Sequence, residues 1–312
     1  MTPKERAIAA FKLQEPDDIV PTFELQFQLS EELLGRKHLT QQELDQASPT
    51  ERDRLLHENA ELYVAEAERL DYSIVSVTYG PSKPEDLAKT VSLVKQMVGN
   101  DRLVAVGSDG TLAIPSGQTM MDLVGQIMDS PDEFRKRLDR GVDASLNYIR
   151  PLRDAGAEVV LMWSDYCFNT GPFLSPEMFS QFVTPYLARQ TEGFHEMGMY
   201  AIKHTDGNIM PVLDQIISTK PDALHSIDPQ GGMDLGEVKR LIGDKVALCG
   251  NVHCGMLHSG TVEEVIEDSK RALAQGKPGG GFFFTTSNTP FIGMPLQNYL
   301  AMLDVRMKYG KY

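Results

Sequence analysis

The feature that most constrains the fold is a regular alternation of short apolar runs with longer amphipathic segments. From residue 71 onward, runs rich in Val, Ile, Leu and Phe are each followed by polar turn residues and then by a helical pattern. Strands that alternate with helices at this spacing build βα units around a parallel sheet. About eight such strands can be counted, as a (β/α)8 barrel requires.

The expected elements follow from this pattern. Strands are predicted at residues 19–20, 72–77, 103–106, 159–163, 199–202, 223–227, 246–248 and 282–284. Helices are predicted at residues 4–13, 28–70 with a break at Pro49, 119–128, 131–155, 175–197, 210–218, 234–242, 261–274 and 295–308. No linker interrupts the pattern, so we expect one α/β domain over residues 1–312, a TIM-type barrel. Residues 1–70 would supply an N-terminal helical extension and the first strand, capping the barrel.

Composition excludes several classes of function. The chain has 41% hydrophobic and 24% charged residues, which is typical of a soluble globular protein. A formal net charge of −14 argues against nucleic-acid or anionic-membrane partners. The longest apolar runs are far below the ~20 residues of a membrane span. The N-terminus lacks a signal-peptide pattern, and three cysteines cannot form a disulfide framework, so we expect a cytoplasmic protein.

Several common catalytic motifs are absent from the sequence. There is no Gly-x-Gly-x-x-Gly dinucleotide loop and no Gly-Lys-Ser/Thr phosphate loop. There is also no Gly-x-Ser-x-Gly elbow and no Cys-x-x-Cys pair. A serine hydrolase and a structural zinc site are therefore disfavoured.

Polar residues follow most of the predicted strands. In a barrel, the carboxyl ends of all strands meet at one mouth, where the chemistry takes place. His204 and Asp206 come directly after a buried strand and before a Gly-Asn turn. The polar residues expected at the mouth are Glu24, Asp109, Asp165, His204, Asp206, Asp228, Asn251, Cys254 and Asn288.

This set combines an imidazole, a thiol and carboxylates, which together are a plausible ligand set for zinc. Three protein ligands with an open fourth position would let the metal activate a bound thiol, alcohol or water. Other interpretations stay open. Cys254 can equally be a buried small side chain, and Asp109, Asp165 and Asp228 can be ion-pair partners of Lys or Arg. Among the remaining histidines, His225 is expected in the core. Surface positions are expected for His38, His57, His195 and His258.

Several motifs in combination resemble the uroporphyrinogen decarboxylase (URO-D) superfamily. They are Pro-Lys-Glu-Arg at 3–6, Gly-Pro-Phe-Leu-Ser-Pro at 171–176, His-Thr-Asp-Gly-Asn at 204–208, Gly-Asn-Val at 250–252 and Pro-Gly-Gly-Gly-Phe at 278–282. The resemblance covers essentially the whole chain. It implies a distorted (β/α)8 barrel with the active site at its mouth.

The superfamily has two branches. True uroporphyrinogen decarboxylases hold their polycarboxylate substrate with an arginine-rich motif after the first strand, whereas residues 21–27 here contain Glu24 and no arginine. The histidine that follows their last strand appears here as Asn288. Since an acidic mouth would repel such a substrate, the resemblance favours the other branch. That branch comprises zinc-dependent methyltransferases that exchange methyl groups with a corrinoid protein.

In the coenzyme M-methylating members, the zinc ligands are a His-x-Cys pair after a middle strand and a Cys after the last strand. These positions fall on His204, on Asp206 and on or near Asn288, so both cysteines are replaced. Residues 250–254 and 308–312 look more like the demethylating methyltransferases. Those enzymes pass a methyl group from a methylated or methoxylated small molecule to a corrinoid protein, and zinc polarises the leaving atom.

We therefore predict a zinc-dependent methyltransferase whose partners are a small-molecule methyl donor and a corrinoid protein. A homodimer stays an open option. Two alternatives also remain: a metal-independent decarboxylase of a smaller carboxylated substrate with Asp109 or Asp165 as the ionic group, and a non-catalytic binding barrel. The predicted metal ligands are His204, Asp206, Asp228 and Cys254. The predicted catalytic residues are Asp165, Asp109 and Asn251. The predicted substrate-binding residues are Glu24, Phe23, Tyr79, Trp163, Tyr166 and Asn288.

Overall fold

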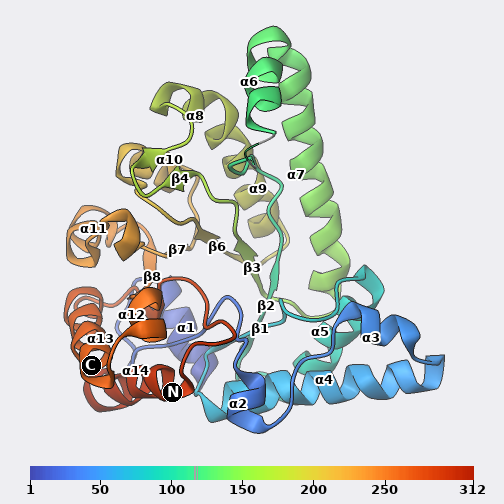
Figure 1. Ribbon diagram of the computed structural model, residues 1–312, viewed down its shortest axis with the longest axis vertical. Helices are drawn as coiled ribbons and strands as arrows, with labels where there is room; N and C mark the ends of the chain where they lie inside the picture. Colours follow the sequence, from blue (N-terminus) through green and yellow to red (C-terminus); the bar gives the residue numbers. More distant parts are fainter. Residues whose placement is uncertain (116, 118) are drawn as a thin grey trace.

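A curved parallel sheet surrounded by helices forms the centre of the protein, in a computed structural model that describes residues 1–115, 117 and 119–312 (Figure 1). Its strand order is β1-β2-β3-β6-β7-β8-β9, and a separate antiparallel pair joins β4 to β5. This arrangement confirms the predicted α/β barrel class. The strands are β1 Ile74–Ser76, β2 Leu103–Gly107, β3 Val159–Met162, β4 Cys167–Phe168, β5 Gly171–Pro172, β6 Tyr200–His204, β7 Ala223–His225, β8 Ala247–Val252 and β9 Phe282–Thr286.

Helices occupy most of the connections between strands. They are α1 Pro3–Phe11, α2 Ser30–Leu34, α3 Gln41–Gln46, α4 Pro49–Arg69, α5 Pro84–Val98, α6 Met120–Asp129, α7 Pro131–Asp154, α8 Pro176–Phe182, α9 Thr184–Glu196, α10 Leu213–Ser218, α11 Leu235–Ile242, α12 Cys254–Ser259, α13 Val262–Gly276 and α14 Leu296–Tyr309, with short 3-10 turns η1 Met210–Val212 and η2 Pro229–Gly231. Helices α5 and α12 were not predicted.

Two predicted helical segments are divided in the structure. The segment 28–70 forms three helices, of which only α4 is long. The predicted helix at residues 175–197 is two helices that meet at Val183. Pro185 lies in the first turn of α9, where its missing N–H costs nothing, but it could not continue α8 as an interior residue.

The first predicted strand is not a strand of the sheet. Residues 20–24 instead run as an extended segment between β9 and β1. The Phe284 N–H donates to the Pro21 carbonyl at 2.9 Å, and the Ser73 N–H donates to the Thr22 carbonyl at 2.8 Å. Proline has no N–H to donate, so a regular ladder cannot form around Pro21. The segment takes the eighth place around the barrel and links its two edge strands.

The two ends of the chain lie side by side next to this segment (Figure 1). Ile19 and Lys311 form an antiparallel bridge, and the Val20 N–H donates to the Gly310 carbonyl at 3.0 Å. The buried guanidinium of Arg306 donates to the Val20 carbonyl at 2.7 Å and pairs with Asp71. The last helix, α14, therefore holds residues 20–24 in place. We call these residues the closing segment.

The interior of the barrel is apolar. Side chains alternate along the strands, so every second residue points inward. The inward-facing residues include Ile74, Leu103, Ala105, Val159, Leu161, Ile202, Ala223, Ala247, Cys249 and Phe283. Phe11 of α1 stacks on Tyr200 at the start of β6, with ring centroids 4.3 Å apart. Helix α1 thus covers the amino end of the barrel, and the carboxyl ends of the strands form the mouth.

Glu24 ties the closing segment to β9. Its carboxyl accepts hydrogen bonds from the Thr286 N–H at 3.1 Å and from the Tyr299 hydroxyl at 3.2 Å, and its other oxygen lies 2.6 Å from the Thr286 hydroxyl. The side chain is fully buried, and burial raises its pKa to about 8. At neutral pH the carboxyl is therefore mainly protonated.

This raised pKa predicts a pH-dependent stability. The folded state binds the Glu24 proton more tightly than the unfolded state, so the free energy of unfolding should fall as the pH rises from about 5 to about 8, by at most about 1.4 kcal/mol per pH unit. Glu24→Gln keeps the shape and hydrogen bonds of the protonated acid. We expect the variant to lose this pH dependence and to be the more stable protein at pH 8 to 9. Urea unfolding of both proteins across this range is the measurement, and parallel profiles would contradict the prediction.

Candidate active site

The end of β6 supplies two ionisable side chains that point in opposite directions. Ile202 belongs to the barrel interior and Ala201 to the layer between strands and helices. By alternation, His204 shares the inward face of Ile202, and Lys203 shares the outward face of Ala201. Both side chains are buried. His204 therefore reaches the mouth from inside the barrel.

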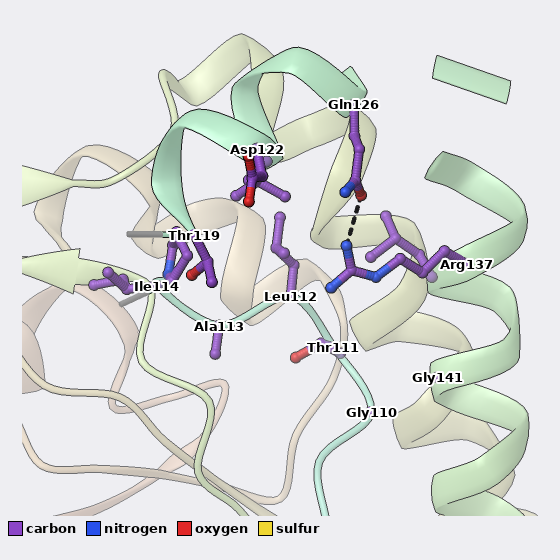
Figure 2. Close-up of a pocket in the computed structure, with 13 residues that line it drawn as sticks. Gly110, Thr111, Leu112, Ala113, Ile114, Thr119, Asp122, Gln126, Arg137 and Gly141 are labelled. Carbon is purple, nitrogen blue, oxygen red and sulfur yellow. Dashed lines mark hydrogen bonds between the residues drawn. The ribbon is translucent and has the colours of Figure 1, made fainter. Parts of the chain in front are cut away.

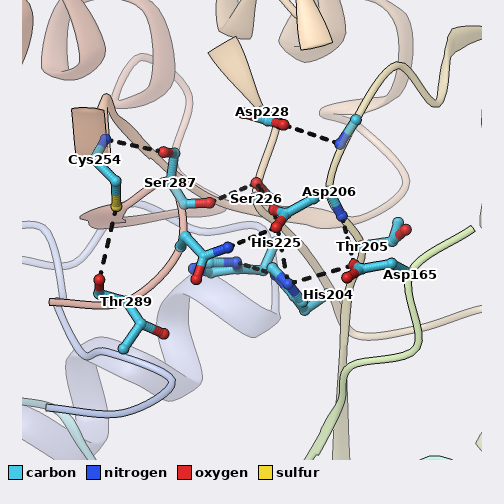
Figure 3. A network of polar contacts seen from close by, with 12 residues as sticks. Asp165, His204, Thr205, Asp206, His225, Ser226, Asp228, Cys254, Ser287 and Thr289 are labelled. Atoms are coloured by element: carbon cyan, nitrogen blue, oxygen red, sulfur yellow. Dashed lines mark hydrogen bonds and ion pairs between the residues drawn. The ribbon is translucent and has the colours of Figure 1, made fainter. Parts of the chain in front are cut away.

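Asp165, His204 and Asp206 come together at the mouth (Figure 3). The Nε2 atom of His204 lies 3.7 Å from a carboxylate oxygen of Asp165 and 3.7 Å from one of Asp206. One donor atom from each residue can be chosen so that all three lie within 4.8 Å of one another. Among the described residues, these three form the one group of at least three His, Cys, Asp or Glu side chains whose donor atoms lie close enough together to hold a metal ion. The register of β3 against β6 pairs Met162 with Lys203, which brings the two strand exits side by side.

Neighbouring groups orient both carboxylates. Asp165 accepts a hydrogen bond from the Asp206 N–H at 2.9 Å. One oxygen of Asp206 accepts from the Ser226 hydroxyl at 2.9 Å, and the other accepts from the Asn288 amide at 2.6 Å. The side chains of Asp165 and Asp206 remain 44% and 31% exposed, so they face the solvent at the mouth. The carboxylates are thus held in place while still reachable.

The turn after Asp206 depends on Gly207. Its φ is +82°, and a Cβ there would lie 2.5 Å from the Cys167 carbonyl oxygen. Only glycine tolerates both the left-handed backbone and this close approach. The Gly207 N–H donates to Asp228 at 3.0 Å. This turn lets the chain leave β6 sharply, so that Asp206 folds back toward His204.

Burial sets the charge of the group. It lowers the pKa of His204 despite the two nearby carboxylates, and it raises the pKa of Asp206. At neutral pH the imidazole is therefore neutral, with one ring nitrogen carrying a lone pair. A neutral imidazole beside carboxylates is a donor set that attracts a divalent cation.

Two predicted metal ligands lie apart from this group. Asp228 accepts hydrogen bonds from the Gly207 and Gln230 N–H groups, so its oxygens cap backbone amides. Cys254 begins α12, where its thiol faces the Thr289 carbonyl at 4.0 Å. Burial raises the pKa of this thiol, and metal binding needs the thiolate. The structure gives both residues a role in holding loops rather than a place beside His204.

Asp109 forms a buried ion pair with Lys203, in line with the ion-pair alternative that the sequence left open for this residue. Its carboxylate lies 2.8 Å from the Lys203 ammonium, and both side chains are at most 1% exposed. Burial alone would raise the pKa of Asp109, but Lys203 outweighs it and holds this pKa at about 2. Asp109 also accepts from the Ser164 N–H at 2.9 Å and from Thr111. The pair fixes the loops after β2 and β3. The signal in the sequence is the lysine that directly follows the apolar run 199–202 and precedes His204.

Four other predicted site residues are turned away from the mouth. Asn251 is buried, and its amide donates to the Ile227 carbonyl at 2.8 Å while its oxygen accepts from Arg271. Phe23 packs edge-on against Phe283 inside the barrel. The remaining two are also buried: Glu24, which binds β9 as described above, and Tyr166, whose ring lies under the Lys203 ammonium.

Two predicted aromatic residues, Trp163 and Tyr79, lie nearer the surface. Asn288 is also only partly buried, and its amide bonds to Asp206 as described above. Trp163 is 38% exposed and packs across Gly107, where a Cβ would lie 1.9 Å from the indole ring. Tyr79 is half-buried beside His38, with ring centroids 6.1 Å apart. His38 was predicted at the surface, but it is buried and bonds to Asn59 and Glu66.

A cavity of about 670 Å³ lies next to the mouth, between residues 110–115, α6 and α7 (Figure 2). Arg137 and Gln126 form a hydrogen bond across one side of it. Residues 112–114 separate the cavity from Asp165, since the Ile114 N–H donates to the Asp165 carbonyl at 2.9 Å. The volume suits a small ligand. None of the three candidate metal residues lines this cavity.

No helix among the described residues is long and apolar enough to cross a membrane. Methylcobamide:CoM methyltransferase MtaA from Methanosarcina barkeri is 24% identical over 227 residues, which cover 71% of this chain and 62% of that protein. A uroporphyrinogen decarboxylase from Pseudoalteromonas atlantica is 25% identical over 65% of this chain and 58% of its own length. The chain thus spans about six-tenths of these curated relatives.

A solved methyltransferase structure from Methanosarcina mazei superimposes with a TM-score of 0.76 at 19% identity, covering 99% of both chains. At this identity, the match establishes the fold alone. The model of the uroporphyrinogen decarboxylase (URO-D) family matches residues 77–309, well over half of the chain. This protein therefore belongs to the uroporphyrinogen decarboxylase family.

Proposed function

We propose that this protein is a metal-dependent methyltransferase that moves a methyl group from a small methylated or methoxylated compound to a corrinoid protein. The observation that carries the proposal is the convergence of Asp165, His204 and Asp206 at the mouth. The similarity to MtaA, whose name gives a methylcobamide as its substrate, supports corrinoid-linked methyl transfer. Family membership supports enzymatic activity.

The donor group fits zinc. One imidazole nitrogen and two carboxylate oxygens are ligands that zinc accepts, and three protein ligands leave a position open for a substrate. Two ligands of a tetrahedral zinc are roughly 3.4 Å apart, given bonds of about 2.0–2.2 Å. The observed 3.7 Å between His204 Nε2 and each carboxylate is close to that spacing. With no thiolate in the group, manganese and cobalt are also compatible ions.

A bound zinc would act as a Lewis acid on the oxygen or other atom that loses the methyl group. The residues of the chain do the remaining work. Asn288 and Ser226 hold Asp206, and the Asp206 N–H holds Asp165, so the donors need little rearrangement. Trp163 offers an exposed apolar surface just after β3. The buried pair of Lys203 and Asp109 keeps the β2 and β3 loops rigid below it.

Coenzyme M is a less suitable acceptor for this site. The positions that resemble the cysteine ligands of coenzyme M-methylating enzymes carry Asp206 and Asn288, which bond to each other at 2.6 Å. A carboxylate makes the metal a stronger Lewis acid than thiolates do, because it donates less electron density. The site is thereby suited to accepting a leaving oxygen, and this favours an ether or a similar methyl donor.

Metal content tests the donor group. We expect about one zinc per chain in the wild-type protein, and loss of most of it in His204→Ala and Asp206→Ala, because each removes one of three ligands. Cys254→Ser is the matched control and should retain zinc, since its thiol faces the Thr289 carbonyl. Elemental analysis after dialysis against a trace of zinc is the measurement. Zinc that survives in both alanine variants would place the ion elsewhere.

Methyl transfer tests the reaction itself. Purified protein incubated with cob(I)alamin and a panel of methoxylated aromatics and methylated amines should form methylcobalamin, followed by its visible absorption. His204→Ala should lower the rate at least 100-fold, as expected for loss of an electrophilic group. Release of CO2 from a carboxylated substrate by metal-free protein would instead support the decarboxylase alternative.

Asp109 and Asp165 are the two carboxylates named for the decarboxylase alternative. Substituting the first should mainly lower the stability of the fold, and substituting the second should mainly lower zinc binding. Asp109→Asn leaves the Lys203 ammonium buried without a counter-charge, so we expect the free energy of unfolding to fall by about 3–5 kcal/mol. Asp165→Asn affects a half-exposed side chain and should cost under about 1 kcal/mol, while zinc binding is lost. Urea unfolding combined with metal analysis separates the effects, and equal destabilisation by both would contradict these roles.

A further inference from the structure

The two histidines of neighbouring strands share a hydrogen bond inside the barrel. The Nδ1 atoms of His204 and His225 are 2.9 Å apart, and the register pairs the two residues directly across β6 and β7 (Figure 3). Beyond His225, its Nε2 atom lies 3.4 Å from the Thr285 hydroxyl oxygen on β9. That hydroxyl donates its own proton to the Thr286 carbonyl at 2.9 Å. A continuous chain of polar atoms thus leads from the mouth into the barrel.

His225 is an unusual side chain for its surroundings. It is fully buried, and its inward-facing neighbours include the apolar Ala223, Cys249 and Phe283. A buried imidazole costs free energy unless its nitrogens are hydrogen-bonded, and an apolar residue is the usual choice in such a layer. The hydrogen-bond partners of His225 among the described residues are His204 and Thr285, neither of which is an anion. A positive charge on this ring would therefore be buried without a partner, which is costly, so the ring is neutral and its two nitrogens act as one donor and one acceptor.

Two arrangements of protons satisfy the contact between the two Nδ1 atoms. In one, His225 donates to His204, the proton of His204 sits on Nε2, and that atom cannot bind a metal. The Thr285 hydroxyl would then have to leave its 2.9 Å contact with Thr286 in order to donate to His225 across 3.4 Å. In the other, His204 donates to His225, and His225 donates to Thr285, which keeps its bond to Thr286. The second arrangement leaves the Nε2 lone pair of His204 facing Asp165 and Asp206.

We propose that His225 is a positioning residue: its Nδ1 accepts a hydrogen bond from the Nδ1–H of His204, its Nε2–H donates a hydrogen bond to the Thr285 hydroxyl, and the Nε2 lone pair of His204 is thereby directed at the cation position. This inference rests on the metal site proposed above. It adds a residue that touches neither metal nor substrate and that sets the tautomer of the imidazole ligand. A partner on the second nitrogen of a metal-bound histidine typically changes metal affinity by about 10- to 100-fold.

The experiment compares three variants by metal affinity. His225→Leu removes the acceptor but keeps an apolar side chain of moderate size. His225→Asn retains an oxygen near the position of Nδ1 that can accept the His204 proton. Thr285→Val keeps the shape of threonine but removes the acceptor for His225. Calorimetric titration of metal-free protein with zinc gives the dissociation constant, cobalt(II) absorption reports the ligand set, and thermal unfolding confirms that each variant is folded.

We expect zinc binding to weaken roughly 10- to 100-fold in His225→Leu, to return most of the way in His225→Asn, and to weaken by less in Thr285→Val. ¹⁵N-histidine NMR of the zinc-loaded wild type should show His204 protonated on Nδ1. Unchanged affinity in His225→Leu, or a zinc-bound His204 without a proton on Nδ1, would overturn this inference and leave the proposed function intact. A wild-type protein that binds no divalent metal would overturn both.

Discussion

The alternation of side chains at the end of β6 is the constraint on which the rest of the mouth depends. Consecutive residues, Lys203 and His204, must point to opposite faces of the sheet. Lys203 therefore enters the layer behind the strands, where its ammonium pairs with Asp109 and also donates to the Ser164 carbonyl. His204 enters the barrel and reaches the mouth. One strand end thus anchors the neighbouring loops and presents the imidazole at the same time, and a shift of register by one residue would exchange the two roles.

The acidic residues at the mouth divide into two kinds by their partners. Asp109 and Asp228 are almost completely buried and are saturated by backbone N–H groups or by an ammonium. Asp165 and Asp206 remain partly exposed and share their oxygens with the space in front of His204. Asp109 and Asp228 fix the loops after the strands. The fixed loops in turn hold Asp165 and Asp206 in position. The same residue type therefore occurs within one strand-exit layer both as a buried loop anchor and as a partly exposed carboxylate beside the imidazole.

Much of the fold was predictable because its signals are local. Apolar runs, proline positions and turn residues located the seven strands of the parallel sheet but not the short pair β4 and β5, and the polar residues after β3 and β6 converge. Residues 19–20 are not a strand of the sheet because they bond to the last residues of the chain instead, and the next residue, Pro21, has no N–H for a ladder. Phe23, Glu24 and Tyr166 are turned away from the mouth for another reason. A strand-exit residue can point inward, outward or into the mouth, and only the register with its neighbours decides between them.

Residues that act through other residues were the hardest to find from the sequence. His225 and Ser226 follow an apolar pair and carry no motif, and their significance lies in contacts with His204 and Asp206 across the sheet. Their sequence separation from these partners is about the length of one βα unit, which no local pattern can register. Lys203 was similarly hidden beside the histidine that drew attention to the segment.

The position of the donor group has a consequence for the whole molecule. Asp165 follows β3, while His204 and Asp206 belong to β6 and its exit, so the donors join two βα units that are separated along the chain by β4, β5, α8 and α9. A cation held by all three would act as a removable cross-link at the open end of the barrel. Because the unfolded chain has no such site, each increase in free metal concentration above the dissociation constant would shift the folding equilibrium toward the native state. Metal supply would then influence how long the protein persists as well as what it catalyses.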